Sequence, residues 1–175
     1  NKNILGLSYK YQHNNKWATT FFGKVYALNV ESNQRTGNTI ETTQDIEISN
    51  NNYGYGIASS YFITSNLQVK ASFENAFRLP TAEEFFGDGL LIESNVDLKP
   101  EQSKNLNIGA SYNFKIKENN FLELGATYIH RDAKNLIYNI VTVSSPTSQK
   151  GNLADVKANG FQGSFGYNYK DLFNL

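Results

Sequence analysis

The sequence predicts an all-β chain, an antiparallel transmembrane β-barrel of which about seven or eight strands are present, as part of a larger barrel. Three observations predict this class. Apolar and polar residues alternate along several segments, short and long connections alternate between these segments, and aromatic residues, 14% of the 175 residues, gather beside the short connections. A helical membrane protein is excluded, because no apolar run approaches the roughly 20 residues that a membrane helix needs.

Seven segments are expected to form strands because every second residue is apolar in them. In the segment NLNIGASYNF, one face carries Leu106, Ile108, Ala110, Tyr112 and Phe114, and the other face carries Asn and other small or polar residues. The expected strands run over residues 4–11, 17–28, 53–63, 67–77, 106–114, 121–131 and 161–169. In a barrel the apolar face meets lipid, and the polar face, with Lys24, Lys70, Glu74 and Glu123, lines the lumen.

The connections differ in length along the chain. Short, Asn-rich turns follow the first, third and fifth strands, with the sequences QHNNK, TSN and KIKENN. Residues 31–52, 78–103 and 132–155 are expected to be long loops of about 20 to 25 residues. Outer-membrane barrels have short periplasmic turns and long extracellular loops, whereas a soluble β-sandwich has short connections at both ends. A soluble β-sandwich, such as an adhesin or a glycan-binding module, remains an alternative because apolar and polar residues also alternate along its strands.

Aromatic side chains lie where a membrane-interface girdle is expected. The residues beside the short turns are Tyr11, Trp17, Tyr61, Phe62, Phe114 and Phe121. Ordinary cross-strand pairing of aromatic residues in hairpins is the alternative explanation.

Charge and composition narrow the function. The 16 basic and 16 acidic residues give a net charge of +0, so no basic surface favours nucleic acid. Without cysteine there is no disulfide framework and no thiol catalysis. The mean hydropathy of −0.49 is compatible with barrel strands, which hide their apolar residues at every second position. Because the chain begins at Asn1, without an initiator methionine or a signal peptide, we expect it to be a piece of a longer precursor.

The stretch FENAFRLPTAEEFFGDG ends a strand in an unusual way. Pro80 cannot donate to a ladder and keeps Leu79 extended, so the strand is expected to end here and the chain to turn over the barrel mouth. The adjacent carboxylates Glu83 and Glu84 then lie in a loop at the rim. They have three possible roles: acid/base catalysis, pairing with Arg78 or another protein surface, and simple solvation.

Catalysis and metal binding find little support elsewhere in the sequence. No candidate nucleophile, phosphate-binding loop or nearby histidine accompanies the two carboxylates, so we expect no enzyme activity and no cofactor. His13 falls in a turn and His130 near a strand end, too isolated for a metal site.

The same stretch carries a family resemblance. AFRLPTAEEFFG followed by NVDLKPEQSKNLNIGASYNF resembles the hallmark segment of TonB-dependent outer-membrane receptors, roughly Phe-Arg-x-Pro-Thr-x-x-Glu-Leu, a loop and then Leu-Lys-Pro-Glu. The matching residues are Phe77, Arg78, Pro80, Thr81, Glu84, Leu98, Lys99, Pro100 and Glu101. Two positions depart from the pattern: Val96 stands where proline is common, and Gln162 replaces a glutamate expected to face the lumen.

This resemblance implies that residues 1–175 are part of the barrel domain of an outer-membrane active transporter of a Gram-negative cell. Extracellular loops would capture a scarce nutrient, such as a siderophore or cobalamin, and uptake would be coupled to the TonB complex through a plug domain that this sequence lacks. The implied partners are the nutrient, the TonB complex and outer-membrane lipid, with no nucleic acid. A passive porin-like barrel is the alternative among membrane proteins. The sequence does not name the ligand.

Overall fold

The computed structural model describes residues 1–36, 42–117, 120–141, 146–152, 155–169 and 173–174. Its elements follow one another along the chain as β1 (Lys2–Gln12), β2 (Trp17–Thr36), β3 (Thr42–Phe62), β4 (Leu67–Arg78), α1 (Ala82–Phe86), β5 (Ile92–Glu93), β6 (Glu101–Lys117), β7 (Asn120–Lys134), β8 (Ile137–Val141), β9 (Ser148–Asn152), β10 (Val156–Tyr169) and β11 (Phe173–Asn174).

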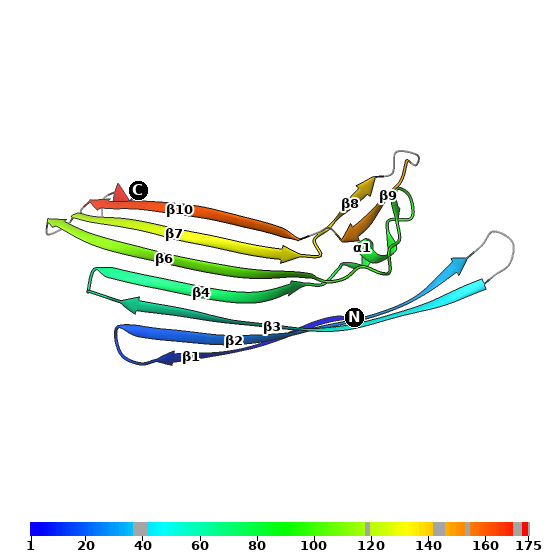
Figure 1. Cartoon of the computed structure of the whole chain (residues 1–175), viewed down its shortest axis with the longest axis horizontal. Coiled ribbons are helices and arrows are strands. Elements are labelled where there is room, and N and C mark those ends of the chain that lie inside the picture. Colours follow the sequence, from blue (N-terminus) through cyan, green and yellow to red (C-terminus); the bar gives the residue numbers. More distant parts are fainter. Residues whose placement is uncertain (37–41, 118–119, 142–145, 153–154, 170–172, 175) are drawn as a thin grey trace.

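One antiparallel sheet dominates the structure, with the strand order β1-β2-β3-β4-β6-β7-β10-β11. Its long strands lie side by side as one open curved layer, and β8, β9 and α1 gather at one end of that layer (Figure 1). A second sheet, in the order β5-β9-β8, lies in this cluster. The prediction of a partial antiparallel barrel is confirmed, because each long strand pairs with its sequence neighbour and the sheet does not close. Among the described residues, no helix has the length and hydrophobicity that a membrane crossing requires.

The strand register keeps one face of the sheet apolar across all the long strands. Ala110 lies opposite Val69 on one side and Ala126 on the other, and Gly163 continues the row on β10. Side chains on this face are widely exposed, for example Leu7 at 81% and Phe161 at 86%. An uncovered apolar face that extends over seven strands is the surface that a barrel turns toward lipid.

The short turns are built as expected. Asn14 Oδ1 accepts hydrogen bonds from the amides of Lys16 and Trp17, at 2.8 and 2.9 Å. Thr64 Oγ1 accepts from the amide of Leu67 at 3.0 Å. These side chains replace backbone partners in tight connections, which is why asparagine and threonine suit them. The third turn, at residues 118–119, lies outside the described residues.

The prediction of three long loops without secondary structure was wrong. Residues 31–52 mostly continue β2 and β3, which stay paired out to Thr36 and Thr42. Residues 78–103 hold α1 and β5, and residues 132–155 hold β8 and β9. Apart from Val30, Ile46 and Ile48, residues 31–36 and 42–45 of this hairpin are polar on both faces, so their pattern carries no strand signal.

The aromatic positions agree with a girdle only in part. By register, Tyr11, Trp17, Tyr61 and Phe114 belong to the apolar face beside the short turns. Phe62 pairs with Gln68, and Phe121 pairs with Asn168, so both belong to the opposite, polar face. Their assignment to the girdle was wrong, because proximity to a turn does not fix the parity of a residue.

The sheet forks between β3 and β4. Their pairing stops at Tyr55 and Asn75, after which β3 continues with β2 alone. The Asn75 side chain is buried at this fork: its Nδ2 donates to the Tyr53 carbonyl oxygen at 3.4 Å, and its Oδ1 accepts from Gln102 Nε2 at 2.7 Å. Asn75 thus supplies the contacts that a continuing strand partner would have made.

Candidate functional site

The candidate site is the rim joint, which we define as residues 78–84, from the end of β4 into the first turn of α1, and residues 98–101, which lead into β6. β4 ends at Arg78, as Pro80 predicted, and Leu79 and Pro80 are both fully buried. The Leu79 side chain belongs to a buried cluster with Tyr26, Leu28, Phe85 and Leu98. This cluster packs the segment that follows β4 against β2, beyond the point where β3 and β4 separate.

Helix α1 begins with a capping box. Thr81 Oγ1 accepts from the Glu84 amide at 3.2 Å, and Glu84 Oε2 accepts from the Thr81 amide at 2.8 Å. These two bonds satisfy amides that a helix start leaves free. A five-residue helix is too short to show periodicity, so the expectation of a loop around Glu83 and Glu84 was wrong. The Thr81 and Glu84 spacing was the signal that could have identified it.

Arg78 joins the two halves of the family motif. Its Nη1 donates to both carboxylate oxygens of Glu84, at 3.0 and 3.1 Å, and its Nη2 donates to Glu101 Oε1 at 2.7 Å. Of the possible roles for the paired carboxylates, Glu84 pairs with Arg78, whereas Glu83 is exposed. A planar guanidinium suits this position because it can hold two carboxylates at once.

The contacts within the rim joint lower the pKa values of its two carboxyl groups, Glu84 and Glu101. The hydrogen bond from Arg78 holds the pKa of Glu101 below its usual range, against the effect of partial burial. Partial burial acts to raise the pKa of Glu84, but the bonds from Arg78 and Thr81 outweigh it and leave the pKa lowered. Both carboxylates are therefore ionised at neutral pH.

Glu101 also contacts the start of β8. Its Oε1 accepts from the Ile137 amide, the first residue of β8, at 2.8 Å. The Ile137 side chain packs against the buried cluster of the rim joint. One carboxylate therefore links β4, β6 and β8.

Asn152, at the end of β9, makes a second link that the sequence did not reveal. Its Oδ1 accepts from the Lys99 amide at 2.8 Å, and its Nδ2 donates to the carbonyl oxygens of Lys99 and Asn135, at 3.0 and 2.7 Å. Asn95 Nδ2 donates similarly to the Lys150 carbonyl at 2.7 Å. No local pattern predicts the contacts of Asn152 with Lys99 or of Asn95 with Lys150, because these partners lie 53 and 55 residues apart and meet only after β8 and β9 have formed.

The nine motif residues thus gather at the outer rim. Pro80, Leu98 and Pro100 are buried, and the Phe77 ring lies 6.0 Å from the Tyr26 ring, centre to centre. Arg78, Thr81, Glu84 and Glu101 form the polar contacts, while Lys99 takes part through its backbone. No described group of histidine and acidic residues could hold a metal ion.

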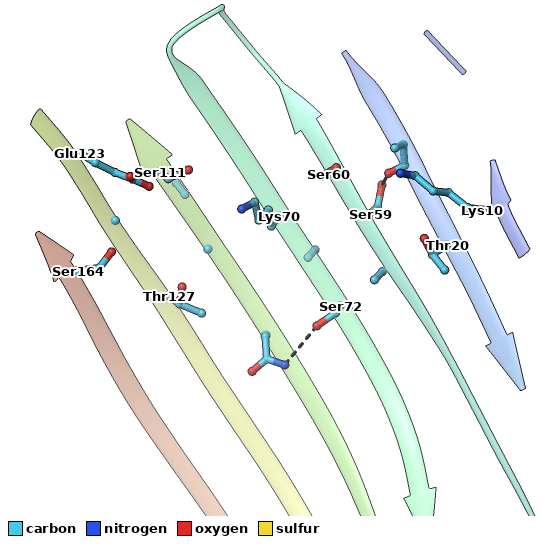
Figure 2. A pocket seen from close by; sticks show the side chains of 17 residues that line it. Lys10, Thr20, Ser59, Ser60, Lys70, Ser72, Ser111, Glu123, Thr127 and Ser164 are labelled. Carbon is cyan, nitrogen blue, oxygen red and sulfur yellow. Dashed lines mark hydrogen bonds between the residues drawn. The ribbon is translucent and has the colours of Figure 1, made fainter. Parts of the chain in front are cut away.

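The polar face of the sheet forms a shallow hollow of about 600 Å³. Lys10, Lys70 and Glu123 line it together with small residues such as Ser72, Gly109 and Ser164 (Figure 2). Small side chains leave this wall open to another surface, and the expectation that Lys70 and Glu123 face the polar side is confirmed. Lys24, also on this face, pairs with Glu74 at 3.0 Å.

Comparison with known proteins identifies the family. The family model described as TonB dependent receptor-like, beta-barrel, matches residues 5–175. The chain belongs to this family. TonB-dependent receptor barrels are outer-membrane proteins, so the exposed apolar face of the sheet is the lipid-facing side of the barrel. The alternative of a soluble β-sandwich was wrong, since the long strands form one open sheet rather than two packed sheets.

Solved structures share the fold at low sequence identity. The hemophore receptor HasR of Serratia marcescens, solved with its hemophore HasA and heme, matches with a TM-score of 0.73, at 13% identity over 95% of this chain and 32% of that chain. The copper transporter OprC matches with a TM-score of 0.70, at 16% identity over 97% of this chain and 26% of that chain. The siderophore receptor PirA from Pseudomonas aeruginosa matches with a TM-score of 0.60, at 18% identity over 94% of this chain and 36% of that chain.

This chain therefore spans about a third of the length of HasR and PirA and about a quarter of that of OprC. Among curated proteins, no significant match was found.

Proposed function

We propose that this chain forms part of the barrel of an outer-membrane active transporter. In this proposal the outer segments capture a scarce nutrient, such as a siderophore or cobalamin, the polar wall faces a plug domain, and the TonB complex drives uptake through that plug. The chain performs no chemical transformation. Family membership favours this function over a passive porin.

The observation that carries the proposal is the rim joint. Arg78, Glu101 and Asn152 fix two outer segments, residues 79–98 and the described parts of 135–152 (135–141 and 146–152), to the ends of the barrel strands. Loops that capture a ligand need a defined arrangement, because ordering mobile loops on binding costs affinity. The exposed polar wall below the joint supports contact with a plug.

Uptake by the full-length protein tests the energy source. Cells that lack other receptors would express it and be supplied with ferric siderophores or cobalamin at limiting concentration. We expect nutrient-dependent growth in cells with TonB and none in cells without it. Equal uptake in both strains would favour the passive porin and contradict the proposal.

The role of the joint is tested by Arg78→Gln, which leaves Glu84 and Glu101 without their shared partner. We expect weaker ligand binding, by about tenfold, with an unchanged amount of barrel in the membrane. Lys99→Gln is the matched control, since it removes a positive charge from the same rim while the Lys99 backbone contacts remain. Equal effects of the two variants would contradict a positioning role for Arg78.

A further inference from the structure

The lipid-facing side of the sheet carries an asymmetric set of basic residues. The described side chains of β1 to β4 place no lysine or arginine on this face, as judged by the register. Three adjacent strands differ: Lys104 on β6, Lys134 on β7 and Lys157 on β10 have the same parity as the apolar residues of their strands. All three lysines are exposed.

Lys104 and Lys157 flank one position. Both pair in register with Asp132, which lies on the strand between them. Strands lie about 4.8 Å apart, so the two lysine backbones are about 10 Å from each other, a span that two flexible lysine side chains can close around one anion. Neither ammonium group has an ion pair or hydrogen bond within the described parts of the chain, whereas Lys134 lies 3.5 Å from Asp155.

The position of Lys104 and Lys157 along the membrane normal matches the position of the outer lipid headgroups. Lys104 lies ten residues before Phe114 of the girdle, and Lys157 lies ten residues before Tyr167. Ten residues span about 33 Å along a strand, or about 25 Å along the membrane normal at a tilt of about 40°. That distance equals the height of the apolar band of an outer-membrane barrel, about 25 Å.

The residues on the membrane side of Lys104 and Lys157 are also typical of the boundary between the apolar band and the headgroups. The Tyr128 ring packs against the Phe161 ring at 5.2 Å between centres, and Tyr128 Oη donates to Asn159 Oδ1 at 2.9 Å. His130 Nδ1 also lies 2.7 Å from Asn159 Oδ1. An aromatic body with a polar tip is typical of the membrane interface, so the next residues outward reach the headgroups.

We propose that Lys104 and Lys157 form a binding site for a phosphate-bearing lipid headgroup of the outer leaflet. The ammonium groups reach the headgroup layer, while the lipid chains lie along the apolar residues Leu106, Ile108 and Phe161. Asp132 is the opposing charge in the site, and one of its carboxylate oxygens is buried without a hydrogen-bond partner among the described residues. The Asp132 side chain is shorter than those of the two lysines and stays near the sheet, so its negative charge weakens anion binding without preventing it.

The experiment titrates a short-chain phosphatidic acid into the full-length protein in neutral detergent and follows the thermal unfolding midpoint, which a ligand of the folded state raises. We expect a saturable rise. Lys104→Gln or Lys157→Gln should weaken the apparent affinity about fivefold, and the double variant about thirtyfold. Asp132→Asn should tighten it. Lys70→Gln, on the lumen side of the same sheet, should leave it unchanged.

Two further titrations separate the sources of the effect. A carboxylate-bearing lipid of the same chain length tests charge alone, and inorganic phosphate tests the anion without its chains; both should give far smaller shifts. The proposal is overturned if the double variant binds phosphatidic acid like the unmodified protein, or if Lys70→Gln weakens binding equally. Equal shifts with the carboxylate-bearing lipid or with inorganic phosphate would also overturn it.

Discussion

Arg78 shows how one side chain can connect elements that are distant in sequence. It holds Glu84 from the helix and Glu101 from the next long strand, and Glu101 in turn holds the amide of Ile137. The side chains of Glu84 and Glu101 are only 15% exposed, although that of Arg78 is 42% exposed, so solvent screens these contacts less than it screens a fully exposed ion pair. The motif residues that the sequence singled out are thus parts of one structural joint.

Low pH should open this joint. The folded state lowers the pKa of both Glu84 and Glu101, so their contribution to stability is present above the ordinary value of 4.5 and is lost as the pH falls through the lowered values. Hydrogen exchange of residues 79–98, corrected for the intrinsic pH dependence of exchange, should show constant protection from pH 7 to 5 and faster opening below about pH 4.5.

The control is the double variant Glu84→Gln and Glu101→Gln, which should open more readily at pH 7 and lose most of this pH dependence. Opening that increases between pH 7 and 5 would show that other groups control the segment.

Gly87 and Gly89 form a matched pair that tests the close packing after α1. Both have positive φ, 71° and 75°, but a Cβ at Gly87 would lie 1.9 Å from the Ile92 carbonyl oxygen, whereas a Cβ at Gly89 would meet nothing within 4 Å. Gly89→Ala should cost about 1 to 2 kcal/mol for its backbone conformation. Gly87→Ala should cost clearly more, because it adds a clash.

The measurement is the opening free energy of residues 79–98 by hydrogen exchange in both variants. If the two substitutions have equal effects, the turn does not pack against β5 as described.

Among the elements, the long strands were predictable within the membrane and less so beyond it. Within the membrane one face meets lipid and the other lines the lumen, so Leu106 to Phe114 alternate and reveal their strand. Farther out, residues 31–36 and 42–45 are polar on both faces and pair without alternation, whereas Val30 and Ile48 next to them pack against the buried cluster. Short elements such as β5, β8 and β9 depend on each other for pairing, which no local pattern encodes.

The candidate site was predictable to a similar degree. The motif named Arg78, Glu84 and Glu101, but the contacts of Asn75 and Asn152 arise from the fork in the sheet and from the fold of a distant hairpin. A polar residue between Phe73 and Phe77 on the apolar face was the signal that could have identified Asn75, whereas nothing in its local context distinguished Asn152.

An introduced arginine should destabilise the barrel more on the apolar face of the strands than on the polar face. Leu124 lies in mid-strand on the apolar face, opposite Tyr112 and Phe165, so Leu124→Arg should destabilise the barrel by about 2 to 4 kcal/mol in a bilayer. Gln162 pairs with Thr127 on the polar face, and Gln162→Arg should cost much less. Reversible unfolding of the full-length protein in lipid vesicles measures both. Equal losses would mean that the faces are assigned wrongly.

For the whole molecule, the alternation of short turns and outer segments defines a topology. If strands β1 to β4, β6, β7 and β10 each cross the membrane once, the short turns share one side of it, and α1, β8 and β9 lie on the other. Figure 1 shows this separation, with α1, β8 and β9 gathered at one end of the layer. We expect that end to lie outside the cell, because outer-membrane barrels have their longer connections there.

Cysteine labelling on intact cells measures this topology, and the absence of native cysteine makes each signal specific. Single cysteines would replace Leu90 and Val141 at the outer end, which are 82% and 72% exposed, and Asn15 and Ser65 in the short turns, in the full-length protein. A membrane-impermeant maleimide should label the first two on intact cells and the last two only after lysis. Labelling of Asn15→Cys or Ser65→Cys on intact cells, or of all four positions equally, would contradict a barrel that crosses the membrane in this order.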